Sequence, residues 1–351
     1  VGVAPAAIRS ELRITDANDV LKNFGATLPA ARDNQAFDQT DVTAMINADK
    51  TVNLDPEGIS LASTGGFWIA SEGAGSKTAY ETGRNITSAN LLLRVSAAGV
   101  IEEVVTLPDA VNALQTRYGF EGVSESDGKL VVAMQRPWLG EAMPRIAVYD
   151  LTAKTWQFHF YPLDPAASPN GGWVGLSEIT ALGSNRFLVV ERDNQAGPDA
   201  RVKRLYRIDL TGVADGGTLR KTLVRDLMAD LRATHGPILE KIEGLAVLAS
   251  GEVMFVTDND GINESSSETA RAAGRSAVAL GTGAQALADR SSAVGVGNVA
   301  NSVASSAFGH GNTANGSSSN AFGYGNTANG TLSTAVGGSN TAGGYVTAAF
   351  G

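Results

Sequence analysis

Apolar and polar positions between residues 52 and 258 repeat as one unit. Each unit contains an acidic group, a short apolar run, a turn, a second apolar run and a closing polar group. Two apolar runs joined by a short turn predict a β-hairpin. Recurrence at a nearly constant interval predicts a repeat architecture. The four copies are DPEGISLASTGGFWIASE, GFEGVSESDGKLVVAMQR, GLSEITALGSNRFLVVERD and KIEGLAVLASGEVMFVTDND.

A hairpin returns the chain to the end of the sheet where it began, so the first and last polar groups of each unit should lie together. Four such units around an axis would place a ring of carboxylates at one mouth. The leading residues are Glu57, Glu121, Glu178 and Glu243, and the closing residues are Glu72, Gln135, Glu191 and Asp258.

Short β-branched and aromatic segments bounded by turns predict an all-β fold. A recurrence of about 60 residues favours a β-propeller with about four strands per blade. A β-sandwich is the alternative, but it does not explain the recurring glutamate. The predicted strands are 67–71, 90–95, 101–106, 129–135, 145–149, 155–161, 186–191, 204–208 and 252–257. Helices are expected at 110–117 and 225–234 and within 8–28, and a loop or edge strand at 35–49.

Composition changes sharply near residue 270. All 11 prolines and 35 of the 36 acidic residues precede this point. We therefore expect two domains, 1–269 and 270–351. The net charge of −9 argues against a nucleic-acid partner. The chain has no cysteine, which excludes disulfides and thiolate metal sites. No signal peptide or membrane anchor is expected in this chain.

The second domain has its own, shorter period. Alanines at 277, 293, 307, 321, 335 and 349 are each followed by a Val or Phe. A period of 14 residues with two short strands per turn predicts a β-solenoid, with Ala and Gly at tight corners and the Val/Phe ladder in the core. A disordered linker is the alternative. Because one thin coil buries little, a homotrimer is expected to complete the core.

The repeated carboxylates are the main candidates for chemistry. Hard oxygen ligands suit calcium, and like charges near one axis repel unless a cation neutralises them. The expected ligands are therefore the seven acidic residues among the leading and closing groups. The alternative is that each leading Glu caps loop N–H groups. Arg136 and Arg192 follow closing positions and are candidate anion-binding residues, or else ion-pair partners of the nearby acids. A Ser–His–Asp set and a zinc site are both disfavoured.

The segments DPEGISL, RYGFEGVSE, YPLDPAASPNGGWVGLSEI, VVERDNQAGPDARVKRLYRIDL, KTLVRDLMADL and KIEGLAV resemble the phytase-like family, described as having esterase-like activity of phytase. The resemblance covers about residues 26–268. It implies a propeller, export from the cytoplasm, and hydrolysis of phosphate or carboxyl esters with calcium. The match ends at SSSET, where the family would continue into a closing strand, so both a complete and an incomplete propeller ring stay open.

The motifs SAVALG, SAVGVG, SAFGHG, NAFGYG and TAVGGS resemble the head repeats of trimeric autotransporter adhesins of the YadA type, over about residues 274–351. This resemblance implies a left-handed parallel β-roll, a homotrimer, and a bacterial surface with a host or matrix ligand. The leading hypothesis is a secreted or surface ester hydrolase with a trimerising tail. The alternative is a non-enzymatic surface adhesin that displays an inactive propeller fragment.

Overall fold

A computed structural model describes residues 11–30, 37–73, 88–233, 238–258, 271–272, 276–281 and 283–351. The chain divides into two compact units. The first contains residues 1–194, 201–228 and 242–256, and the second contains residues 195–200, 229–241 and 257–351. The expected domain boundary near residue 269 lies outside the described residues.

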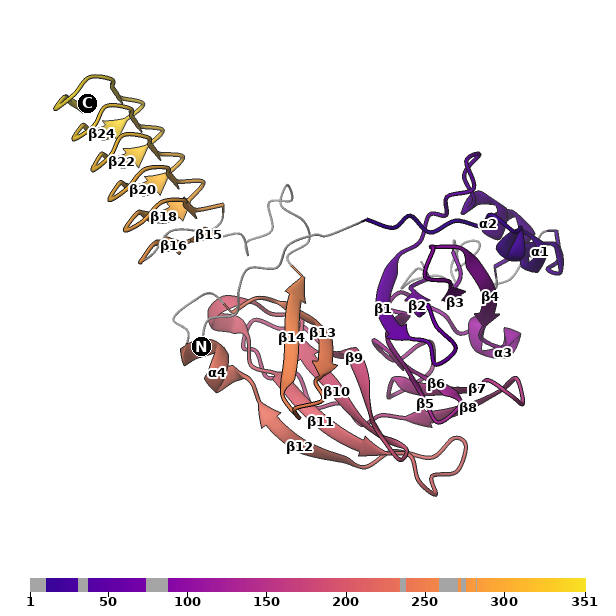
Figure 1. Ribbon diagram of the computed structural model, residues 1–351. Coiled ribbons are helices and arrows are strands. Elements are labelled where there is room, and N and C mark those ends of the chain that lie inside the picture. Colours follow the sequence, from indigo (N-terminus) through magenta and orange to yellow (C-terminus); the bar gives the residue numbers. More distant parts are fainter. Residues whose placement is uncertain are drawn as a thin grey trace. The chain divides into compact units, whose positions relative to one another are not determined.

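Three antiparallel sheets of four strands form most of the first unit (Figure 1), and the two-stranded sheet 4 follows them. Within each of the first three sheets, consecutive strands are hydrogen-bonded neighbours. Sheet 1 contains β1 (Pro56–Leu61), β2 (Phe67–Ser71), β3 (Leu91–Val95) and β4 (Ile101–Thr106). Sheet 2 contains β5 (Phe120–Ser126), β6 (Lys129–Met134), β7 (Arg145–Asp150) and β8 (Thr155–Phe160). Sheet 3 contains β9 (Val174–Gly183), β10 (Arg186–Asp193), β11 (Lys203–Asp209) and β12 (Lys221–Asp226). Sheet 4 contains β13 (Lys241–Val247) and β14 (Val253–Asp258).

The sheets share apolar cores. One core joins Trp68 and Leu92 of sheet 1 to Val132 of sheet 2. Another joins Val131 of sheet 2 to Phe187 of sheet 3. Because successive residues of a strand point to opposite faces, Val131 and Val132 supply the two sides of the same sheet. Sheet 2 is therefore covered on both faces, which explains its nearly continuous apolar strands.

Short helices accompany the sheets, namely α1 (Val20–Ala26), α2 (Gln39–Ala44), α3 (Asp109–Asn112), α4 (Met228–Ala233) and the 3₁₀ turn η1 (Gly197–Asp199). Helix α2 lies where the sequence predicted a loop or edge strand. Its capping box, in which Asp38 accepts N–H groups and Asp41 reaches back, starts the helix. The predicted helix at 225–234 begins too early, because Arg225 belongs to β12. The helix expected at 110–117 ends at Asn112.

The C-terminal part of the second unit is a β-solenoid built from two parallel sheets (Figure 1). Each turn contributes one strand to each sheet, and the register advances by 14 residues from coil to coil. One sheet contains β15 (Arg271–Ala272), β17 (Gln285–Ala286), β19 (Val299–Ala300), β21 (Thr313–Ala314), β23 (Thr327–Ala328) and β25 (Thr341–Ala342). The other contains β16 (Val278–Leu280), β18 (Ser292–Val296), β20 (Ser306–His310), β22 (Asn320–Tyr324), β24 (Thr334–Gly338) and β26 (Ala348–Phe350).

The packing of this solenoid corrects the predicted core. Alanines, not the Val/Phe ladder, fill the interior: Ala293, Ala307 and Ala321 are fully buried. Because neighbouring residues of a strand point to opposite faces, the adjacent Val and Phe side chains lie on the outer surface. The interior between the two sheets is lined by alanine and small polar side chains, so the apolar ladder is left outside.

The first coil also differs from its predicted register. Ala279 pairs with Ala293, and Leu280 pairs with Val294. The period is therefore 14 residues from this coil onward, and the ladder begins at Leu280 rather than at Val278. Within the described residues, no helix is long and apolar enough to cross a membrane.

Candidate functional site

The inner strands of the first three sheets carry a β-bulge at the same point. In sheet 1, Pro56 pairs with Ser71 and Gly58 pairs with Ala70, so Glu57 is the extra residue. In sheet 2 the register shifts between Phe120 and Val123, around Glu121. Bulges redirect a side chain and are common beside active sites. The chain therefore presents both glutamates from equivalent distortions of two neighbouring sheets.

Sheet 3 follows the same scheme with different residues. Its register shifts at Ser177, because Leu176 pairs with Glu191 and Glu178 pairs with Val190. Ser177 is thus the structural equivalent of Glu57 and Glu121. The repeat is displaced by one residue relative to the predicted alignment, which had placed Glu178 at this position.

The closing positions shift in the same way. Ser71, Met134 and Glu191 each pair with the residue that directly precedes the bulge, namely Pro56, Phe120 and Leu176. The next residues along the chain are Glu72, Gln135 and Arg192. Arg192, rather than Glu191, is therefore equivalent to Glu72 and Gln135. Sheet 3 brings a serine and an arginine to the place where sheet 1 brings two acids.

Hydrogen bonds connect these positions from sheet to sheet. The backbone N–H of Gly119 donates to Oε1 of Glu72 at 2.5 Å. The Gln135 side-chain amide donates to Oε1 of Glu121. Nη2 of Arg192 donates to Oε1 of Glu243 at 2.7 Å. Glu121 also interacts electrostatically with Glu57, Glu72, Arg192 and Glu243, so residues from four sheets lie near one another at one end of the first unit.

Glu121 is buried beside these charged groups. It is 2% exposed. Its pKa lies well above the ordinary value because burial disfavours the charged form, and Glu57, Glu72 and Glu243 repel it while Arg192 partly compensates. Its Oε2 atom has no hydrogen-bond partner within the described structure. A buried carboxyl oxygen without a partner, facing other carboxylates, is the arrangement that a cation would relieve.

Asp55, Glu57 and Glu72 lie close enough together to hold a cation. One carboxylate oxygen from each lies within 4.8 Å of the others. We call Asp55, Glu57, Glu72 and Glu121 the carboxylate cluster. Its donors are all hard oxygens, which fit calcium better than zinc or copper. Exposed acidic groups also occur together without an ion, so the partnerless buried Oε2 of Glu121 is the more informative observation.

A cationic residue, Arg136, directly follows Gln135, the hydrogen-bond partner of Glu121. The Arg136 guanidinium carbon is 4.8 Å from the ring centroid of Trp173 and 5.3 Å from that of Tyr118. The two rings are 5.1 Å apart. Tyr118 has a φ of 73°, which is rare for a bulky residue and indicates a strained, fixed position. Burial lowers the pKa of Arg136 from its ordinary value. The guanidinium carbon of Arg192 is 5.7 Å from the ring centroid of Trp173.

Four of the seven predicted metal ligands are not in the carboxylate cluster, and Glu243, which pairs with Arg192, is one of them. Glu178 is buried, with Oε1 accepting the backbone N–H of Ile179 at 2.8 Å. Glu191 is fully buried, accepts the N–H of Asp164, and pairs with Lys221 at 2.7 Å. The side chain of Asp258 lies outside the described residues.

Sequence reasoning missed Asp55, Tyr118, Trp173 and Ser177. Asp55 and Tyr118 each lie close before a leading glutamate, in the motifs DPEG and YGFEG. An alignment that matched the shared E-G-apolar-S pattern with S-E-I-T would have placed Ser177 at the bulge. The ring contacts of Trp173 depend on tertiary packing and left no comparable sequence signal.

The family comparison agrees with this arrangement. The family model described as "Phytase-like: Esterase-like activity of phytase" matches residues 7–261. The chain therefore belongs to the phytase-like family, and this membership suggests a hydrolase-like function. No curated protein matches the sequence at a significant level.

Proposed function

We propose that the first unit hydrolyses phosphate or carboxyl esters at the carboxylate cluster, on a β-propeller whose blades are the four-stranded sheets. The observation that carries the proposal is the convergence of Glu57, Glu72, Glu121, Arg192 and Glu243 at one end of four sheets. Family membership supports the reaction class. The three antiparallel four-stranded sheets support the assignment of each sheet as a blade, since a propeller blade usually has four strands.

Calcium fits the residues that are present. Asp55, Glu57 and Glu72 would hold it, and Glu121 would be relieved of its neighbours' repulsion. When bound, the ion supplies Lewis-acid polarisation of the ester oxygen and a more acidic water. Glu178, Glu191, Glu243 and Asp258 are not part of this proposed set.

The arginines act on the anionic part of the substrate. Arg136 is held between Tyr118 and Trp173, so its planar guanidinium is oriented before substrate arrives. A pre-oriented fork matches two oxygens of a phosphate or carboxylate. Arg192 is engaged with Glu243, so its role is to position that carboxylate and to offset the negative charge around Glu121.

The test is hydrolysis of p-nitrophenyl phosphate and p-nitrophenyl acetate by the full chain, with added calcium and with chelator. We expect activity that the chelator removes. Glu72→Gln should abolish it, and Arg136→Ala should raise the KM for the phosphate ester by about 10-fold, because a bidentate contact to a charged group is lost. Glu103→Gln is the matched control, since Glu103 pairs with Lys154 and is not a member of the carboxylate cluster. Equal activity of wild type and Glu72→Gln would refute the assignment.

For the solenoid, we propose a trimerising, adhesin-type tail. The observation that favours it is the apolar ladder on one outer face, where Leu280 is 60% exposed and Phe350 is 72% exposed. Phe308 and Phe322 stack with their ring centroids 5.3 Å apart. Three coils that bury this face against one another would remove it from water. Such a tail fits a secreted or cell-surface protein with a host or matrix ligand.

A further inference from the structure

A groove lined by three arginines lies at the end of sheet 3 opposite the carboxylate cluster. Its volume is about 570 Å³, and Arg186, Arg207 and Arg220 contribute to its walls. Arg186 begins β10, whereas Arg192 lies near the other end of the same strand. The groove is therefore separate from the candidate site already described. We call it the arginine groove.

Strand register explains why the arginines gather. Arg186 pairs with Asp209 on β11, and Arg207 precedes Asp209 by two residues. Arg207 pairs with Thr222 on β12, and Arg220 precedes Thr222 by two residues. Directly paired residues and residues two apart share one face of a sheet. Three neighbouring strands therefore bring one guanidinium each to the same side.

These arginines are not neutralised by ion pairs. Within the described part of the chain, no carboxylate lies within 4 Å of any of the three, and the ion pairs of sheet 3 use Arg192, Lys203, Arg204 and Lys221 instead. Asp209 is the one acid in the lining, and its Oδ1 accepts the backbone N–H of Thr211 at 2.9 Å. Hydrogen bonds from Thr211 lower the pKa of Asp209, with smaller contributions from Arg186 and Arg207. A chain of net charge −9 thus contains a groove with an excess of positive charge.

Size and charge limit what this groove can hold. Its volume falls in the range of small-molecule sites, about 300–1,000 Å³. Three cations and one anion leave an excess of two positive charges, and a phosphate monoester carries about −1.5 to −2 near neutral pH. Guanidinium forks match phosphate oxygens, and the hydroxyls of Thr218 and Thr222 are further donors in the lining. The negative charge of the whole chain disfavours a long polyanion such as nucleic acid.

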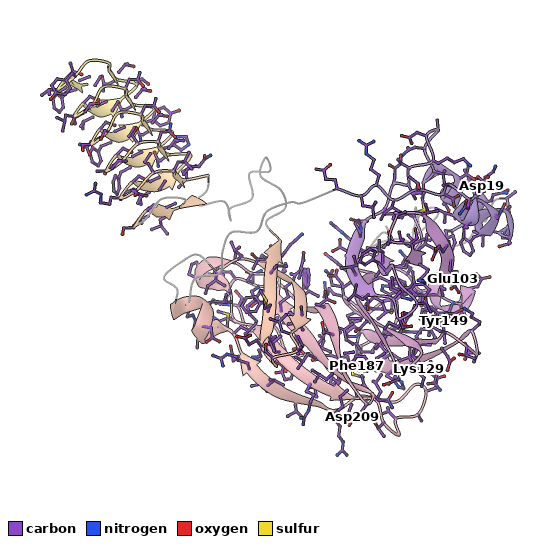
Figure 2. The ribbon with its side chains drawn as sticks, in the orientation of Figure 1. Asp19, Glu103, Lys129, Tyr149, Phe187 and Asp209 are labelled. Carbon is purple, nitrogen blue, oxygen red and sulfur yellow. The ribbon has the colours of Figure 1, made fainter. Side chains whose placement is uncertain are left out.

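A second cavity adjoins the groove and offers room for the rest of such a ligand. It has a volume of about 240 Å³ and shares Thr211 and Val213 with the groove. Gln157, His159 and Asn185 are among its lining residues. Burial lowers the pKa of His159, whose Nδ1 donates to the carbonyl of Ala214 at 3.2 Å. The uncharged amides and neutral imidazole suit hydroxyl groups. Figure 2 labels Lys129 and Phe187, which line this cavity, and Asp209, which lines the groove.

We propose that the arginine groove binds the phosphate group of a small phosphorylated polyol or sugar, whose hydroxyl-bearing part enters the adjoining cavity. Binding here does not depend on the proposed hydrolysis, because no residue of the groove belongs to the carboxylate cluster. The three arginines are exposed, so their replacement should leave the fold intact.

Calorimetric titration of the full chain tests the proposal, with glucose 6-phosphate, inorganic phosphate and glucose as probes. We expect saturable binding of glucose 6-phosphate, at least 10-fold weaker binding of inorganic phosphate, and none of glucose. Arg207→Gln combined with Arg220→Gln should weaken glucose 6-phosphate binding by at least about 10-fold, because two charge-assisted contacts are lost. Arg207→Lys should recover only part of the loss, since lysine has no fork.

Two further variants serve as controls. Arg290→Gln makes the same charge change at an exposed position of the solenoid and should bind like wild type. Glu57→Gln combined with Glu72→Gln should also retain full binding, even if it no longer hydrolyses esters. The proposal is overturned if no phosphate probe binds saturably, if inorganic phosphate binds as tightly as glucose 6-phosphate, or if the double arginine variant binds like wild type.

Discussion

Glu178 lies buried between β9 and β13, where its carboxyl oxygens accept backbone N–H groups of Ile179 and Leu245. Burial raises its pKa to about 8 despite these hydrogen bonds. The folded chain therefore holds this proton more tightly than the unfolded chain does. Stability from this group is fully present below the ordinary carboxyl pKa and is lost as the pH rises toward about 8.

The isosteric variant Glu178→Gln should remove this dependence. At pH 5 we expect the same Tm as wild type, because both side chains are neutral. At pH 9 the variant should be more stable, by up to a few kcal/mol, since each pKa unit corresponds to about 1.4 kcal/mol. Thermal unfolding across this pH range measures the difference. Parallel Tm curves for the two proteins would contradict the buried placement.

The sequence repeat predicted some residues of the candidate site. Glu57, Glu72 and Glu121 were identified from the repeat because a hairpin must return its ends to one place. Glu178 and Glu191 were misaligned because the third unit reads S-E where the others read E-G, and both residues are acidic. Only the strand register, which pairs Leu176 with Glu191, shows that Ser177 rather than Glu178 is at the bulge.

At the scale of elements, the inner strands pack so closely that glycine is required. A Cβ added to Gly58 would lie 2.4 Å from the carbonyl oxygen of Glu121 and 2.8 Å from the backbone nitrogen of Val123. Both neighbours are backbone atoms and cannot move without shifting β5. The glycine therefore sets the spacing between β1 and β5, and with it the approach of Glu57 to Glu121.

Gly58→Ala should lower stability by about 3 kcal/mol, at the upper end for overpacking. Because β1 and β5 would separate, calcium-dependent ester hydrolysis should fall as well. Gly338→Ala is the control, since an added Cβ there meets nothing within 4 Å. Denaturant unfolding of both variants provides the comparison. A Gly58→Ala chain with wild-type stability would show that the sheets are farther apart than described.

The solenoid strands present their apolar ladder outward, so its substitution tests association rather than folding. Phe322 is 36% exposed, in the middle of the ladder. We expect Phe322→Asp to convert a trimer to monomers, because burying an unpaired carboxylate at an interface costs several kcal/mol. The coil itself should stay folded, since its alanine core is untouched.

Analytical ultracentrifugation measures this outcome. Leu332→Asp, at a 49% exposed position outside the strands, is the matched control and should remain trimeric. A wild-type chain that sediments as a monomer at high concentration would contradict the proposed trimer. A trimeric Phe322→Asp chain would place the interface on another face.

At the scale of the whole molecule, the sequence predicted the all-β hairpins and the solenoid better than the packing inside them. Hairpin periodicity gave the strands of the sheets, and the 14-residue period gave the solenoid. The helix at Gln39–Ala44 was missed because its start depends on the Asp38 and Asp41 cap rather than on apolar periodicity. The solenoid core was assigned to Val and Phe because size suggested burial, whereas the close spacing of the two sheets admits alanine.

The central claim is that Asp55, Glu57, Glu72 and Glu121 form a calcium site at one end of the sheets. Calorimetric titration of the full chain with calcium tests it most directly. We predict saturable binding and a higher Tm of the first unit with calcium, because a ligand that binds only the folded state stabilises it. Glu57→Gln combined with Glu72→Gln should abolish both effects, whereas Glu103→Gln should retain them. Calcium binding that is unchanged in the double variant, or absent from wild type at millimolar calcium, would contradict the account.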